Sequence, residues 1–78
     1  MKINNPRLEG MSNNTQEIEN VTIKMLNIRD RHGVEVPTSC VEFTVVGKRN
    51  GRKWRDFLTM EEFAESNPGE LAELINNN

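Results

Sequence analysis

The sequence VEFTVVGKRNGRKWRDFLTMEE, residues 41–62, predicts a β-hairpin that leads into a helix. Apolar and polar residues alternate on both sides of the dipeptide Asn50-Gly51. Asn-Gly between two such runs is the strongest short hairpin signal, because both central residues of a type I′ turn need a positive φ angle. We therefore expect two antiparallel strands joined by a two-residue turn.

The turn also predicts the register of the hairpin, since side chains alternate between the two faces of a strand. It places Gly47 opposite Trp54, where the glycine leaves room for the indole ring. On the same face, Asp56 is a polar misfit that would mark a bulge or a strand end. We expect this face to be the core face because it carries most of the apolar residues. They are Val41, Phe43, Val45, Trp54, Leu58 and Met60.

Basic side chains are concentrated around the turn, where five of the eight residues from 48 to 55 are Lys or Arg. The register sets like charges opposite each other, which destabilises a strand pair. This concentration predicts contact with an anion, either a phosphate backbone or an acidic patch on a protein. The alternative is a solvated turn whose charges guard the sheet against edge pairing. The candidate binding residues are Arg29, Lys48, Arg49, Arg52, Lys53 and Arg55.

Residues 21–29, VTIKMLNIR, predict the preceding strand. Their apolar phase flips at Met25–Leu26, which indicates a bulge there or a strand covered on both faces. A turn over residues 30–33, with Asp first and Gly last, follows. Residues 34–37 could form a short extended piece, which Pro37 restricts to an edge or a loop. We expect the second strand to begin at about Cys40. These short connections favour an antiparallel meander.

Two short helices are predicted after the hairpin. Thr59 and Glu62 have the spacing of a capping box, in which the side chain of each bonds to the backbone N–H of the other. A break falls near Asn67, because the residue before a proline is steered away from the helical region. The Asn67 side chain could also cap the second helix, with Pro68 at its first position.

These elements define a single small α+β domain over residues 20–78. The expected architecture is a three-stranded antiparallel sheet followed by one or two short C-terminal helices packed on one face. Residues 1–19 have few bulky apolar side chains, and we expect a flexible N-terminal tail. A domain of about 60 residues buries only about 60% of its unfolded surface. Its stability as a monomer would be marginal, and a homodimer would add buried surface.

Charge is divided unevenly along the 78 residues, whose net charge is −2. Residues 21–56 carry eight basic and four acidic side chains, whereas residues 57–78 carry five glutamates and no basic residue. The predicted sheet is therefore basic and the helical part acidic. This asymmetry would either orient the protein on a charged partner or compensate charge between packed elements.

The composition also bears on location. No apolar run approaches the roughly 20 residues that span a bilayer, so no membrane association is expected. The start MKINNPRLEG lacks the apolar region of a secretory signal. The single cysteine, Cys40, leaves no internal disulfide framework. We therefore expect a protein of the reducing cytoplasm.

We recognise no catalytic constellation and expect neither an enzyme nor a bound metal or cofactor. Cys40 and His32 are too few for a zinc site with four nitrogen or sulfur ligands. A nucleophilic pair of the two would need a third group to orient the histidine. The five glycines are isolated, so the sequence has no glycine-rich phosphate loop.

Two functions remain. The first is a protein-interaction module, a regulator or inhibitor that acts by docking on a larger protein partner. The accessory proteins of phages and mobile elements include modules of this kind. Small size, an acidic balance and the lack of a catalytic constellation favour this hypothesis.

The second function is nucleic-acid binding through the basic sheet and hairpin. Three strands followed by a helix, with Trp54 on the third strand and Thr59 opening the helix, resemble the AP2-type and integrase arm-binding domains over residues 21–66. Those domains read the major groove with a three-stranded sheet and are usually basic overall, whereas this chain is acidic. The resemblance implies that the six candidate residues contact phosphates or base edges.

The two hypotheses differ in what they require of four basic residues on the sheet. If these residues lie together on one open face, they favour nucleic-acid binding. If the acidic helix covers that face, the arrangement favours a protein partner. The four residues are Lys24, Arg29, Lys53 and Arg55.

Overall fold

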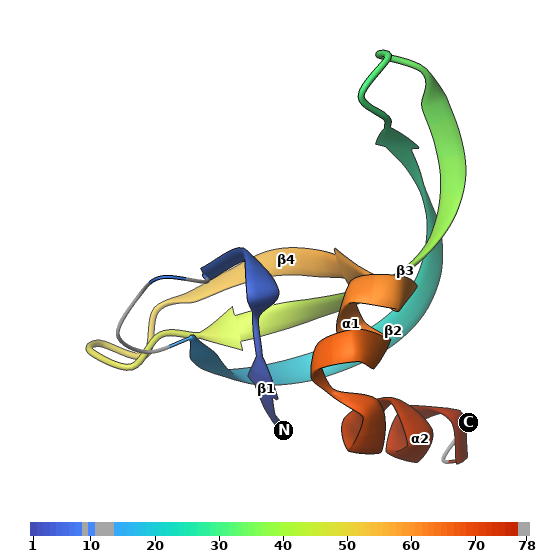
Figure 1. Cartoon of the computed structure of the whole chain (residues 1–78). Coiled ribbons are helices and arrows are strands. Elements are labelled where there is room, and N and C mark those ends of the chain that lie inside the picture. Colours follow the sequence, from blue (N-terminus) through green and yellow to red (C-terminus); the bar gives the residue numbers. More distant parts are fainter. Residues whose placement is uncertain (9, 11–13, 77–78) are drawn as a thin grey trace.

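The computed structural model describes residues 1–8, 10 and 14–76. It contains a curled antiparallel sheet with strand order β1-β2-β3-β4, and two helices follow it in the chain (Figure 1). The predicted α+β class and the C-terminal helices are therefore confirmed, with four strands in place of three. The elements are β1 (Lys2–Asn4), the 3-10 turn η1 (Pro6–Leu8), β2 (Thr15–Arg29), β3 (Glu35–Val46), β4 (Lys53–Thr59), α1 (Met60–Ser66) and α2 (Pro68–Asn76).

The additional strand lies in the segment that we expected to be a flexible tail. β1 pairs antiparallel with the start of β2, and Ile3 and Ile18 from this segment are 2% and 1% exposed. The tail prediction is thus wrong for the described part of residues 1–19; residues 9 and 11–13 lie outside the described residues. A three-residue strand with one apolar side chain has no alternation that a sequence pattern could detect.

A bulge in β2 changes which residues face the core. The β2–β3 register shifts by one residue between Glu19 and Thr22, and Asn20 has a φ of 53°. Asparagine tolerates this left-handed conformation better than most residues, and a left-handed residue is typical of one class of bulge. The extra residue brings both Ile18 and Ile23 to the core side of the sheet. The bulge therefore lies about five residues before the predicted position at Met25–Leu26.

The β3–β4 hairpin differs from the predicted two-residue turn. Val45 pairs with Trp54 and Val41 with Leu58, a register two residues away from the predicted one. A six-residue loop, residues 47–52, joins the strands, and within it Gly51 alone has a positive φ. The longer loop removes the lysine and arginine pairs from positions opposite each other in the ladder, where like charges would be destabilising. A shift of two preserves the predicted sorting of residues onto faces.

Trp54 is not a core residue, contrary to the prediction from the register. Its side chain is 44% exposed near the loop end of β4. The predicted closeness to Gly47 is nevertheless present, since a Cβ atom at Gly47 would lie 3.2 Å from the indole ring. Asp56 marks neither a bulge nor a strand end, because the β3–β4 register is continuous through it.

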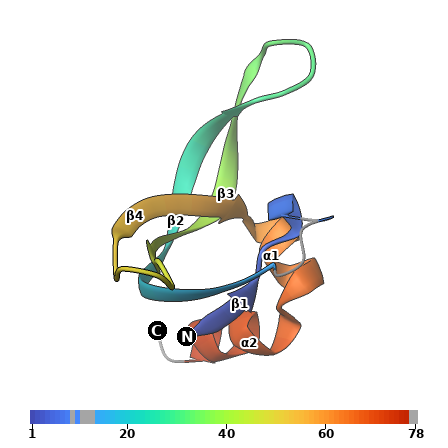
Figure 2. The ribbon, with the colours of Figure 1, turned by 90° about the vertical axis from the view of Figure 1, so that its left-hand side faces the viewer.

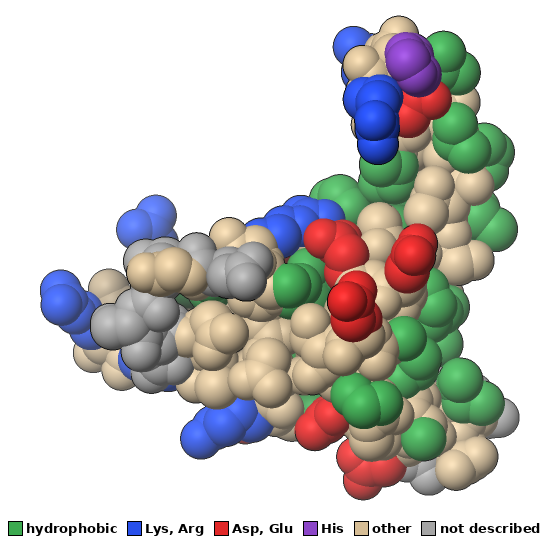
Figure 3. All heavy atoms as spheres, in the orientation of Figure 1, with side chains coloured by type: hydrophobic (Ala, Val, Ile, Leu, Met, Phe, Trp, Pro, Cys, Tyr) green, Lys and Arg blue, Asp and Glu red, His purple; other side chains and the backbone are tan. Residues whose placement is uncertain are grey.

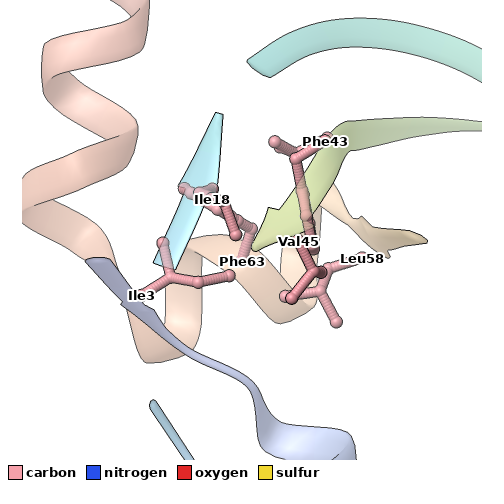
Figure 4. Close-up of a cluster of buried hydrophobic side chains, with 7 residues drawn as sticks. Ile3, Ile18, Phe43, Val45, Leu58 and Phe63 are labelled. Carbon is pink, nitrogen blue, oxygen red and sulfur yellow. The ribbon is translucent and has the colours of Figure 1, made fainter. Parts of the chain in front are cut away.

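The core lies between the concave face of the sheet and the helices. Figure 4 shows Ile3, Ile18 and Phe63 converging with side chains of β3 and β4. Helix α1 begins with the predicted capping box: the Thr59 N–H donates to Glu62 Oε1 at 3.0 Å, and the Glu62 N–H donates to Thr59 Oγ1 at 3.1 Å. The buried apolar residues of this cluster are Ile3, Ile18, Val41, Phe43, Val45, Leu58 and Phe63.

Asn67 separates the two helices, as predicted, but its side chain does not cap α2. The Asn4 N–H donates to Asn67 Oδ1 at 2.8 Å, and Asn67 Nδ2 donates to the Asn4 carbonyl at 2.9 Å. The amide thus pairs with the edge of β1 as a neighbouring strand would. These two bonds tie the first strand to the helical layer. They lie in a site largely shielded from water, because Asn67 is only 2% exposed.

Candidate interaction surface

The middle of the sheet extends into a protruding two-stranded ribbon. β1 pairs with β2 only at residues 15–17, and the β4 ladder on β3 ends at Cys40. The β2–β3 ladder continues to the Arg29–Glu35 pair, beyond both neighbours. We call residues 25–39 the arm; Figures 1 and 2 show it rising away from the sheet and the helices.

The predicted turn over residues 30–33 forms the tip of the arm. Asp30 Oδ1 accepts hydrogen bonds from the His32 N–H at 2.8 Å and from the Val34 N–H at 3.0 Å. Gly33 has a φ of 81°, a conformation that glycine adopts without strain. These bonds close the tip with local interactions, so the turn needs no support from the rest of the protein.

The second strand starts earlier than predicted, at Glu35, and passes through Pro37. Proline is tolerated there because β3 has no second neighbouring strand along the arm within the described residues, and the missing N–H would point to the outside. The proline therefore indicates an edge, as expected, but it does not end the strand.

One face of the arm is apolar along its length. Ile28 pairs with Val36 in the ladder, and Val34 and Leu26 share their face. Val34 and Val36 are 56% and 44% exposed, and the other two are half-buried. We call these four residues the arm patch. Figure 3 shows hydrophobic side chains along the arm, with Lys, Arg and His side chains at its tip.

The opposite face of the arm also exposes apolar side chains. Met25 is 64% exposed and Ile23, at the base of the arm, is 38% exposed. An isolated two-stranded hairpin is marginally stable at best in water. Contiguous exposed apolar residues bounded by polar ones are typical of protein-binding sites. The arm thus combines a two-stranded ribbon with apolar side chains exposed on both of its faces.

The outer face of the sheet, below the arm patch, carries paired charges. Lys53 Nζ lies 2.7 Å from Glu19, and Glu42 lies between Lys24, at 3.3 Å, and Arg55. Partial desolvation opposes ionisation of Glu42, but its two basic neighbours outweigh this effect and lower the pKa of its carboxyl group. Each of the three basic residues on this face therefore has a carboxylate beside it.

The six candidate binding residues fall into two separate groups. Arg29 lies in the arm, on the opposite face from Lys53 and Arg55, and is 3.7 Å from Glu35. The loop between β3 and β4 lies at the other end of the sheet (Figure 1). The four basic sheet residues thus neither share one open face nor lie under the acidic helices.

Three of the candidates are exposed in the β3–β4 loop without an acidic partner among the described residues. Two of them, Lys48 and Arg49, line a pocket together with Trp54, whose ring packs against Gly47. These three residues, which we call the basic loop, are Lys48, Arg49 and Arg52.

A polar cluster around Arg7 was missed by the sequence analysis because it lies in the presumed tail. The guanidinium lies 3.3 Å from Glu62, 4.0 Å from Asp56 and 4.8 Å from the centre of the Phe57 ring. Burial opposes ionisation of Glu62, but the Thr59 N–H and Arg7 outweigh it and lower the pKa of its carboxyl group. Arg7 thereby joins η1 to β4 and to the start of α1.

We expect Glu62→Ala to lower the free energy of unfolding by about 1 kcal/mol at pH 7, because it removes half of the capping box. Glu62→Gln keeps an oxygen that can accept from the Thr59 N–H, so it should cost less. Because the pKa of the Glu62 carboxyl group is lower in the folded protein, the charge-dependent part of this stabilisation is fully present at pH values above the unfolded pKa. It should disappear as the pH falls through the folded pKa.

Urea denaturation at pH 7 and at about pH 3 checks this expectation. The same substitution at the exposed neighbouring residue, Glu61→Gln, is the matched control. A Glu62→Gln effect that is as large in acid as at neutral pH would contradict the charge contribution.

Cys40 and His32 occupy different parts of the fold. Cys40 is fully buried, and burial raises the pKa of its thiol. His32 lies at the tip of the arm. In the described part of the chain, no group of three or more His, Cys, Asp or Glu residues is arranged to hold a metal ion.

Neither helix in the described residues is long and apolar enough to cross a membrane. Comparisons with protein-family models, with curated proteins and with solved structures find no match to this chain. The resemblance to AP2-type and integrase arm-binding domains therefore stays a prediction.

Proposed function

We propose that the protein is a small non-catalytic interaction module that docks on a larger protein partner through the arm patch. The observation that carries this proposal is the protruding ribbon, in which the described residues leave Val34 and Val36 about half exposed. A regulator or inhibitor of this kind would act by occluding a surface of its partner in the cytoplasm, as accessory proteins of phages and mobile elements do.

The size of the exposed patch indicates how much binding energy it would supply. Complete burial of a valine side chain contributes about 1.5–3 kcal/mol, and roughly half of that area is already buried in the free protein. Replacing Val34 and Val36 together would therefore remove about 1.5–3 kcal/mol of binding free energy. This corresponds to a loss of affinity of roughly 10- to 150-fold.

The test is affinity capture from the cells that make the protein, with each captured protein identified and quantified. The wild type should retain a defined partner that the Val34→Ser/Val36→Ser variant loses. The control variant Arg49→Ser/Arg52→Ser, changed in the basic loop, should retain it. A partner held equally by the wild type and the arm variant would contradict the proposal.

A second candidate function is nucleic-acid binding through the basic loop, supported by three exposed cations beside a half-exposed tryptophan. Base stacking on an aromatic ring together with phosphate contacts is a general mode of single-strand binding. This support comes from the loop alone, because the cations on the sheet have carboxylate neighbours.

A salt-dependent titration with single-stranded and duplex oligonucleotides tests this alternative. If the loop binds phosphates, the affinity should fall steeply with salt and disappear in Arg49→Glu/Arg52→Glu. Absence of binding at low salt would remove this function.

A further inference from the structure

The two strands of the arm have different outer edges. The edge of β3 contains Pro37, which cannot donate a hydrogen bond and so blocks strand pairing. The edge of β2 contains neither proline nor glycine over residues 21–29 and has no partner strand among the described residues beyond Ile18. An unprotected edge of this length is a template for an added strand.

The hydrogen-bonding groups at this edge can be assigned from the tip. The Asp30 N–H donates to the Val34 carbonyl at 2.9 Å, so this pair is of the hydrogen-bonded type. Such pairs alternate with non-hydrogen-bonded pairs along an antiparallel ladder. Even-numbered residues of β2 therefore bond to β3, whereas the N–H and C=O groups of Ile23, Met25, Asn27 and Arg29 point outward.

We propose that the occupant of this edge is a second copy of the chain, whose β2 strand pairs antiparallel with the first. The inference rests on the proposed role of the arm and adds its assembly state. Two ribbons joined in this way form a four-stranded sheet, β3-β2-β2-β3, from two ribbons that are each marginal alone. The two arm patches then lie on one face and form a single larger docking surface.

A two-fold axis at Asn27 gives a register in which charge and shape agree. It places Leu26 opposite Ile28 of the second copy, in a non-hydrogen-bonded pair where side chains approach most closely. It places Lys24 opposite Asp30 of the second copy, so opposite charges face each other. A register centred on Lys24 would instead oppose two lysines, which is destabilising.

The contact area indicates a reversible dimer. Five paired residues span about 17 Å of strand. A ribbon edge of that length buries on the order of 800 Å² in total, less than the roughly 1,200 Å² of the smallest stable interfaces. We therefore expect mostly monomer at about 1 μM and mostly dimer near 1 mM, as for other weak contacts.

Sedimentation equilibrium of the full chain over this range of concentrations tests the inference. The wild type should dimerise with rising concentration. Met25→Pro removes an outward N–H without breaking the β2–β3 ladder and should abolish the dimer. Glu35→Pro places the same substitution on the outer edge of β3 and should leave the dimer intact. A wild type that stays monomeric, or equal effects of the two prolines, would overturn the inference.

A disulfide test keeps the inference open to refutation if a proline variant fails to fold. Across the two-fold axis, Asn27 lies opposite Asn27 of the second copy, and the two form a hydrogen-bonded pair. The Cα atoms of such a pair are about 5.5 Å apart, a separation that a disulfide can bridge. Asn27→Cys should therefore oxidise to a dimer on the order of tenfold faster than the exposed control Glu35→Cys. Equal rates would contradict the edge pairing.

The inference and the proposed function can fail separately. A monomeric protein that still loses its partner with Val34→Ser/Val36→Ser would retain the docking function without the dimer. A protein that dimerises but keeps its partner in the Val34→Ser/Val36→Ser variant would retain the dimer without the docking function of the arm patch.

Discussion

Replacing Phe43 by alanine is expected to lower the free energy of unfolding by about 3–5 kcal/mol. Phe43 is 1% exposed, and its side chain belongs to the cluster that joins all four strands to α1. The substitution leaves a cavity among residues that several strands hold in place, so little relaxation can fill it. Single domains are stable by only about 5–15 kcal/mol, so most of the margin would be lost. Urea denaturation measures the effect.

Trp54→Ala is the matched control, because it removes a larger aromatic side chain from the same face of the sheet. The residue is 44% exposed, so the expected cost is about 1 kcal/mol. A Trp54→Ala cost equal to that of Phe43→Ala would mean that the indole belongs to the core and that the β3–β4 register is wrong.

Asn67→Ala is expected to cost about 2–4 kcal/mol, since it removes two hydrogen bonds and leaves the Asn4 N–H and C=O without their partners. Both bonds lie in a site that is shielded from water, and they hold β1 against the helices. Hydrogen exchange should show the Asn4 amide losing protection before the amides of β3 and β4 do.

Asn67→Asp sharpens this prediction because it keeps the acceptor for the Asn4 N–H and replaces the donor to the Asn4 carbonyl. It should also destabilise the protein, through repulsion between two oxygens. The exposed Asn27→Ala is the control and should cost less than about 0.5 kcal/mol. A cost near zero for Asn67→Ala would contradict the role of the amide in anchoring β1.

The parts of the fold that depend on local rules were predictable from the sequence. The capping box of Thr59 and Glu62 and the break at Asn67 require only a few neighbouring residues. The core side of β3 was also predictable, because a register error of two residues leaves each side chain on the same face. Val41, Phe43 and Val45 were therefore assigned correctly, and Trp54 does lie on the predicted face. Its burial was not predictable, because it lies near the loop end of β4 and is 44% exposed there.

Long-range features were not predictable in the same way. β1 has one buried side chain, Ile3, and its place depends on pairing with β2 and on the amide of Asn67, 63 residues away from Asn4. The arm exists because β2 and β3 extend beyond the ends of β1 and β4. The periodicity of a strand's own sequence does not indicate where a neighbouring strand ends. The exposed arm patch therefore looks like ordinary strand sequence until the sheet is assembled.

The most direct test of the arm as a docking surface is site-specific photocrosslinking in the cells that make the protein. A photoreactive phenylalanine at Val36, in the arm patch, should give an adduct with a distinct, larger protein. The same group at the exposed Ala72 of α2 should not. An adduct of twice the chain's mass would report the second copy instead. Absence of any adduct from Val36, or equal adducts from both positions, would contradict the docking role of the arm.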